Sequence, residues 1–83
     1  MATLASVEDD IIRMLGQKIE GDLVLSANTN IVSDTGLDSV SVMDFVFELE
    51  DEFGITVPLD RISDVKTVRQ LAETIHGLIL ESA

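Results

Sequence analysis

The sequence predicts an all-α bundle of three main helices plus one short helix, with a long loop after the first helix. In three separate stretches, apolar residues recur every three or four positions, the spacing of a helix that buries one face. The one strand-like run, residues 55–57, is short and has no partner strand, so we interpret it as an extended connection. The 83 residues form one small domain and include no cysteine, so helix packing rather than disulfides must hold the fold.

The first helix is expected to start at Ser6, which Asp9 follows three residues later, a pattern typical of helix starts. By helical spacing, its apolar face consists of Val7, Ile11, Leu15 and Ile19. Gly21 is expected to end it. Residues 22–37 are rich in loop-forming residues. We expect three apolar residues to pin this loop onto the core: Leu23, Leu25 and Ile31.

The second helix is expected to span residues 39–53 and to end at Gly54. A short helical turn is expected at residues 60–62. Thr67 and Gln70 have the spacing of a capping box, which predicts the start of the last helix. The apolar face of that helix consists of Val68, Leu71, Ile75 and Leu78.

The formal net charge of −11 limits the classes of partner. Nucleic-acid backbones and anionic lipid surfaces repel such a chain, so we expect no nucleic-acid partner and no membrane insertion. A basic protein partner is favoured instead. No apolar run approaches the ~20 residues that span a bilayer, and the first residues lack the segments of a signal peptide. We therefore expect a soluble, cytoplasmic monomer.

The second helix carries two apolar stripes when its residues are placed about 100° apart around the axis. The wider stripe, typical of a core face, consists of Val42, Phe45, Val46, Leu49 and Phe53. The second stripe consists of Val40, Met43 and Phe47. Carboxylates surround it, with Asp44, Glu48 and Asp51 on its far side and Glu50 between the stripes. Either this stripe packs under a neighbouring loop, or it is a docking strip whose acids select a basic partner.

Ser39 lies where the long loop ends and the second helix begins. Serine at such a junction is commonly the cap of the helix. The same place also favours a phosphate ester, because the N-terminal amides and the dipole of a helix attract phosphate. On physical grounds alone, both roles remain open.

Two segments resemble the signature of the acyl carrier protein family. Residues 36–40 read Gly-Leu-Asp-Ser-Val, and residues 44–55 read Asp-Phe-Val-Phe-Glu-Leu-Glu-Asp-Glu-Phe-Gly-Ile. The family has Asp-Ser-Leu, followed by an apolar and acidic helix that ends in Glu-Glu-Phe-Gly. Residues 28–31, 57–58 and 67–68 also match the family's usual places, so the resemblance covers nearly the whole chain.

The resemblance implies an acyl-carrier-like bundle in which Ser39 bears a covalent 4′-phosphopantetheine arm received from coenzyme A. It implies that acyl groups travel as thioesters on the thiol of this arm, so the domain itself needs no catalytic residue. Asp38 matches the aspartate that family members offer to the metal site of the phosphopantetheinyl transferase (holo-acyl carrier protein synthase). The positions that match or adjoin partner contacts are Val40, Met43, Asp44, Phe47, Glu48, Glu50 and Asp51.

The implied partners are this transferase and the acyl-loading and acyl-transfer enzymes of fatty acid, lipid or polyketide biosynthesis, with basic docking patches. The chain departs from the family pattern at Val40, Ser41, Phe45, Phe47, Glu48, Arg61 and Lys66. We interpret these departures as signs of a specialised rather than a housekeeping carrier. The alternatives are an aminoacyl or peptidyl carrier, and an unmodified acidic adaptor that docks through the same helix.

No dedicated metal site is expected. The acidic residues 34–38 lack the third-position ligand, the sixth-position glycine and the twelfth-position glutamate of an EF-hand. His76 is the one histidine of the sequence, and we interpret it as a surface residue near a helix end rather than a ligand.

Overall fold

The computed structural model describes residues 3–19 and 24–82, without the side chains of Ser39 and Ser82. Within these ranges it contains helices α1 (Leu4–Gly16), α2 (Ser39–Phe53), α3 (Leu59–Ile62) and α4 (Val68–Ser82). The same residues form no β-strand, and one isolated bridge joins Asn30 to Thr67. The prediction of three main helices, one short helix and a long loop after the first is therefore confirmed.

The helix α1 begins earlier than the sequence predicts. Thr3 is its N-cap: the Ser6 amide donates to Thr3 Oγ1 at 3.1 Å, and the Thr3 amide donates to Ser6 Oγ at 2.9 Å. The expected start at Ser6 is wrong, because this serine completes the capping box from the third helical position. The helix ends at Gly16, before the predicted stop. That stop, Gly21, and the predicted loop anchor Leu23 lie outside the described residues.

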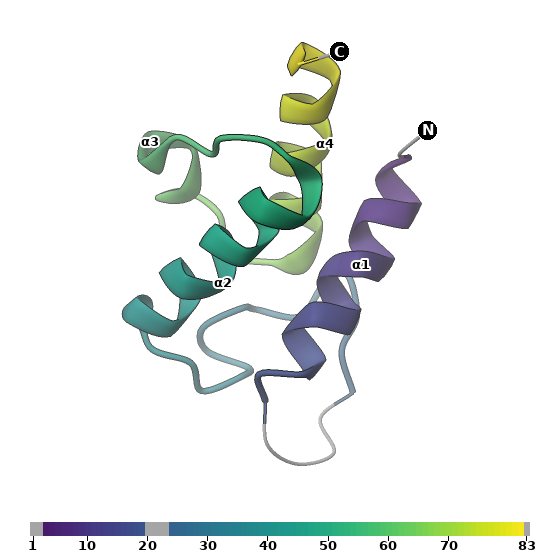
Figure 1. The fold of residues 1–83 in the computed structure, drawn as a ribbon. Helices are drawn as coiled ribbons and strands as arrows, with labels where there is room; N and C mark the ends of the chain where they lie inside the picture. Colours follow the sequence, from purple (N-terminus) through teal and green to yellow (C-terminus); the bar gives the residue numbers. More distant parts are fainter. Residues whose placement is uncertain (1–2, 20–23, 83) are drawn as a thin grey trace.

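One apolar core is shared by the three longer helices. Figure 1 shows α1 and α4 side by side and running in opposite directions, with α2 crossing the bundle in front of α4. The buried side chains of these helices are Val7, Ile11, Leu15, Phe45, Val46, Leu49, Val68, Leu71, Ala72, Ile75 and Leu78. The predicted core faces of α1 and α4 are confirmed, with Ile19 half-buried against the core.

The long loop is fastened to the start of α4 by backbone hydrogen bonds. The Ile31 amide donates to the Lys66 carbonyl at 2.8 Å, and the Val68 amide donates to the Thr29 carbonyl at 3.0 Å. Ile31 is buried, and Leu25 packs against the core. Both residues therefore hold the loop as predicted, and the loop brings the chain back to the first residue of α2.

The bounds of α2 agree with the prediction, and Gly54 ends it in the left-handed conformation, with φ of 65°. The amides of Gly54 and Ile55 both donate to the Glu50 carbonyl. The chain then runs through an extended connection to Pro58, which precedes α3. None of the four residues of α3 is fully buried, and Arg61 joins this helix to Glu81 of α4 by an ion pair at 3.4 Å.

The two glycines Gly54 and Gly77 should respond to alanine in opposite ways. Gly54→Ala should lower the free energy of unfolding by about 1–2 kcal/mol, because a Cβ disfavours the left-handed conformation. Gly77 lies inside α4 with open space where a Cβ would be, so Gly77→Ala should raise this free energy by about 0.4–1 kcal/mol. Urea denaturation of both variants measures the difference. A stabilised Gly54→Ala variant would contradict the left-handed helix end.

Candidate functional site

Ser39 is the first residue of α2, and Asp38 directly before it is the N-cap. The Ser41 amide donates to Asp38 Oδ1 at 2.8 Å, and the Val42 amide donates to the Asp38 carbonyl at 3.0 Å. Of the two roles that the sequence left open for Ser39, that of the helix cap belongs to Asp38 instead. Because the carboxylate of Asp38 already accepts from the orphan amide of Ser41 in the first turn, the helix needs no cap from Ser39.

The Asp38 carboxylate is held in its charged form. The hydrogen bond from the Ser41 amide, followed by one from the Ser41 hydroxyl, lowers the pKa of Asp38 below its ordinary value of 3.8. Both donors favour the ionised carboxylate. Asp38 is exposed, so at neutral pH a negative charge stands in solvent directly beside the backbone of Ser39.

The segment before α2 is shaped by local hydrogen bonds. Asn30 Oδ1 accepts from the amides of Val32 and Ser33 at 3.0 and 2.9 Å, and Asp34 Oδ2 accepts from the Asn30 amide at 2.8 Å. Gly36 follows with φ of 75°, a conformation that favours glycine. These polar side chains therefore build the turn that leads to Ser39. In the part of the chain that the structure describes, no three His, Cys, Asp or Glu residues are grouped as metal ligands.

The second apolar stripe of α2 is partly exposed to solvent and partly packed beside a hollow in the surface. Val40 and Phe47 are exposed, with 69% and 57% of their surface open to solvent. Met43 is half-buried, so the first two side chains of the stripe are open to solvent and the third is partly packed. The docking role of the stripe stays a prediction. Met43 faces the loop and α3, as the loop-packing interpretation of the stripe required.

The hollow beside Met43 has a volume of about 240 Å³ and a mostly apolar lining. It is lined by Ile31, Val32, Val42, Met43, Val46, Ile62, Ser63, Val65 and Leu71. These residues come from the long loop, α2, the α3 region and α4. Val42 and Met43 follow Ser39 by three and four residues, which places them on its side of the helix one turn further along. An apolar hollow therefore opens one turn from the start of α2.

The four acids predicted for docking have different surroundings. Asp44 and Asp51 are exposed. Glu48 Oε2 lies 2.6 Å from Lys18 Nζ. Glu50 Oε2 accepts a hydrogen bond from the Val57 amide at 3.0 Å, so this half-buried side chain braces the connection after α2. The docking role of all four stays a prediction, but two of the carboxylates already have partners within the chain.

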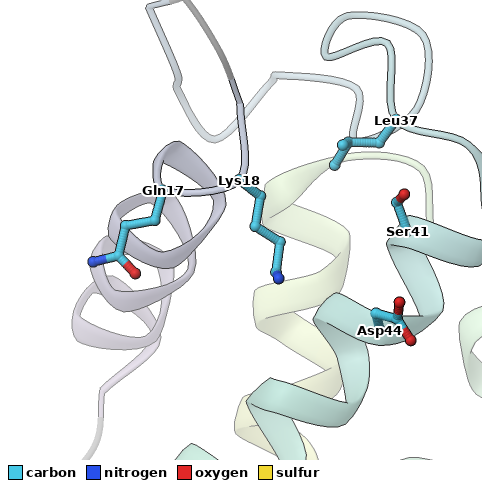
Figure 2. A pocket seen from close by; sticks show the side chains of 5 residues that line it. All are labelled: Gln17, Lys18, Leu37, Ser41 and Asp44. Carbon is cyan, nitrogen blue, oxygen red and sulfur yellow. The ribbon is translucent and has the colours of Figure 1, made fainter.

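A second hollow, which the sequence did not reveal, lies on another side of α2. Its volume is about 300 Å³, and it is lined by Gln17, Lys18, Leu37, Ser41 and Asp44. Figure 2 shows Lys18 reaching from the end of α1 towards α2, where Ser41 and Asp44 line the opposite wall. Lys18 and α2 are far apart in the sequence, so no local pattern could predict this contact.

The comparisons with known proteins agree with this geometry. The sequence model of the phosphopantetheine attachment site family matches residues 9–75. A probable acyl carrier protein of Caulobacter vibrioides is 36% identical over 66 residues, which are 80% of this chain and 72% of that protein. The chain belongs to the acyl carrier protein family. The cofactor of this family is a covalently attached 4′-phosphopantetheine, as the resemblance implied, and the function of the chain is that of an acyl carrier.

Solved structures of acyl carrier proteins share the fold. The acyl carrier protein of Thermotoga maritima superposes with a TM-score of 0.80 at 22% identity, over 96% of this chain and 94% of that one. The 3,7-dioxo-octyl actinorhodin acyl carrier protein of Streptomyces coelicolor gives a TM-score of 0.70 at 27% identity, over 98% and 94% of the two chains. Among the described residues, no helix of this carrier is long and apolar enough to cross a membrane.

Substitutions of Glu50 and Asp51 test whether Glu50 stabilises the connection after α2 in addition to its predicted role in docking. Glu50→Ala removes the acceptor of the buried Val57 amide, and an unsatisfied buried amide costs about 1–3 kcal/mol. We expect a loss of that size in the free energy of unfolding. Asp51→Ala is the matched control, because an exposed substitution changes stability by about 0.5 kcal/mol or less. Equal stability of the two variants in chemical denaturation would refute the bracing role.

The pKa of Asp38 predicts the direction of a pH effect. Its pKa is lower in the folded state than in the unfolded state, so the carboxylate stabilises the fold above pH 3.8, and this contribution is lost as the pH falls through the folded pKa. The ¹³C titration of the Asp38 carboxyl should have its midpoint below 3.8. A midpoint at or above this value would show that the capping hydrogen bonds do not form in solution.

Proposed function

We propose that Ser39 is the residue that bears the 4′-phosphopantetheine arm, and that residues 1–83 act as one non-catalytic carrier domain for acyl groups. The observation that carries this proposal is the position of Ser39 as the first residue of α2, behind the Asp38 cap. The match of the family's serine to Ser39 supports the same residue. When bound, the arm supplies the thiol that holds an acyl group as a thioester.

The start of α2 has the chemistry that a phosphodiester requires. The amides of Ser39 and Val40 precede Val42, whose amide makes the first i→i−4 hydrogen bond of the helix, to the Asp38 carbonyl. Such amides and the dipole of a 15-residue helix attract phosphate. In the transfer, the Ser39 hydroxyl forms a bond to the phosphorus that carries pantetheine. The pyrophosphate bond of coenzyme A breaks, 3′,5′-ADP leaves, and the hydroxyl proton passes to a base of the transferase.

The apolar hollow beside α2 supports an acyl rather than an aminoacyl cargo. Its lining contains one polar residue, Ser63, and no charged residue, so it suits a hydrocarbon chain and offers nothing to pair with a charged amine. Fatty acid, lipid and polyketide biosynthesis supply such chains. The 3,7-dioxo-octyl cargo of the Streptomyces coelicolor carrier is a polyketide-like chain. An aminoacyl or peptidyl carrier, and an unmodified adaptor, remain the alternatives to be tested.

The enzymes that act on this carrier are proposed to dock on α2 through basic patches. Five acids and no base are among its residues, and Val40 and Phe47 offer exposed apolar contacts. Complementary charge speeds and orients such encounters. The phosphopantetheinyl transferase is the first of these partners. The cytoplasmic location and the monomeric state expected from the sequence stay predictions.

Modification with coenzyme A and a broad-specificity transferase tests the assignment of Ser39. The wild-type chain should gain one arm, as measured by intact mass, and Ser39→Ala should gain none. Ser33→Ala and Ser41→Ala are the matched controls and should still be modified. Arm transfer to Ser39→Ala would falsify the site. A wild-type chain that stays unmodified would favour the adaptor.

The mass of cargo on protein from its native host separates acyl from aminoacyl carriers.

A further inference from the structure

The ion pair between Lys18 and Glu48 joins the end of α1 to the middle of α2. Lys18 Nζ and Glu48 Oε2 are 2.6 Å apart, and the Lys18 side chain keeps only 28% of its surface exposed, against 52% for Glu48. Figure 2 shows the lysine lying between the two helices, with Asp44 on the α2 side of the same hollow. An internal cation therefore sits on the surface that the proposed function gives to basic partners.

Asp44, Glu48 and Asp51 form one acidic stripe along α2. Their spacing of four and three residues places them on a single face of the helix. Lys18 binds Glu48, the central member of this stripe, and Asp44 and Asp51 are exposed on either side. The stripe thus has two outer negative charges, and the charge of Glu48 between them is neutralised by Lys18.

The placement of this lysine differs from that of the other basic residues with ion pairs. Those pairs are Arg13 with Asp10, Arg61 with Glu81, and Arg69 with Glu8. The first pair lies within α1, the second joins α3 to α4, and the third joins α4 to α1. Among the ion pairs of the described residues, only that of Lys18 reaches α2. Compensation by an internal base is therefore concentrated at the centre of the acidic stripe.

We propose that Lys18 is a specificity-determining residue of the docking surface, which withholds Glu48 from partner enzymes. This inference rests on the proposed function. A partner cation placed opposite Glu48 meets the lysine ammonium, and this repulsion selects against such a partner. Cations placed opposite Asp44 and Asp51 meet carboxylates that have no ion-pair partner in the part of the chain that the structure describes. These two residues are seven positions apart, which is about 10 Å along a helix. The fitting partner therefore presents two basic groups about 10 Å apart with none between them.

Arm transfer by a basic phosphopantetheinyl transferase tests the inference with the whole chain. Lys18→Met restores the charge of Glu48 to the stripe, so kcat/KM for transfer should rise about two- to fivefold at low salt. The gain should disappear at high salt, because screening removes the steering. It should also be lost in the double variant Lys18→Met/Glu48→Gln, which lacks the released carboxylate.

Arg13→Met is the matched control for net charge, because it also removes one base from an exposed ion pair that includes α1. It should leave kcat/KM nearly unchanged. An equal gain in Arg13→Met, or no gain in Lys18→Met, would overturn the inference. The pair of Lys18 with Glu48 is partly exposed, and such a surface pair contributes about 1 kcal/mol or less, so the melting temperature of Lys18→Met should fall by no more than about 8 °C. Lys18→Gln repeats the test with a polar side chain.

Binding of helical peptides gives a readout that needs no arm. One peptide carries two arginines seven positions apart, and the other carries a third arginine between them, four positions after the first. The third arginine should not tighten binding to the wild-type chain, and should tighten it two- to fivefold for Lys18→Met at low salt. The same gain for both chains would overturn the inference. If the wild type is not modified by the transferase but the peptides behave as expected, the attachment site fails and the role of Lys18 stands.

Discussion

The position of α2 depends on how the long loop is tied to the start of α4. The backbone hydrogen bonds of Ile31 and Val68 fasten this loop without a strand, disulfide or metal in the described residues. Burial of Ile31 adds the apolar part of the anchor. Because the loop is fixed there, the turn that follows can place Asp38 as a cap and Ser39 as the first residue of α2. A small domain with a modest core thus presents one serine at a defined helix end.

Prediction from the sequence was most accurate for helix bounds and caps that depend on contacts between neighbouring residues. The bounds of α2, its end at Gly54, and the capping box of Thr67 and Gln70 all depend on contacts within a few residues, and all were confirmed. The start of α1 was placed too late, and the role of Ser39 as a cap or an ester site was left open, because several residues near each start can accept a hydrogen bond. The caps are Thr3 for α1 and Asp38 for α2. In both helices the cap lies N-terminal to the serine that was considered.

Contacts between distant segments could not be read from helical spacing. Spacing separated the two apolar stripes of α2, but only the fold shows that Met43 borders a hollow while Phe47 faces solvent. The same holds for the acids. Glu48 and Glu50 look alike in the sequence, yet one is joined to Lys18 and the other to the Val57 amide. A count of charges on a helix therefore overstates the charge that it offers to another protein.

The short helix α3 forms one side of the apolar hollow, and it is weakly held. It is a single turn, none of its residues is fully buried, and its ion pair to α4 is exposed. Neither an isolated turn nor an exposed ion pair contributes much free energy. The other side of the hollow is built on α2 and α4, which share the core. The volume of this hollow therefore depends on the position of α3, and a displacement of this short helix would change that volume while the packing of α2 on α4 stays intact.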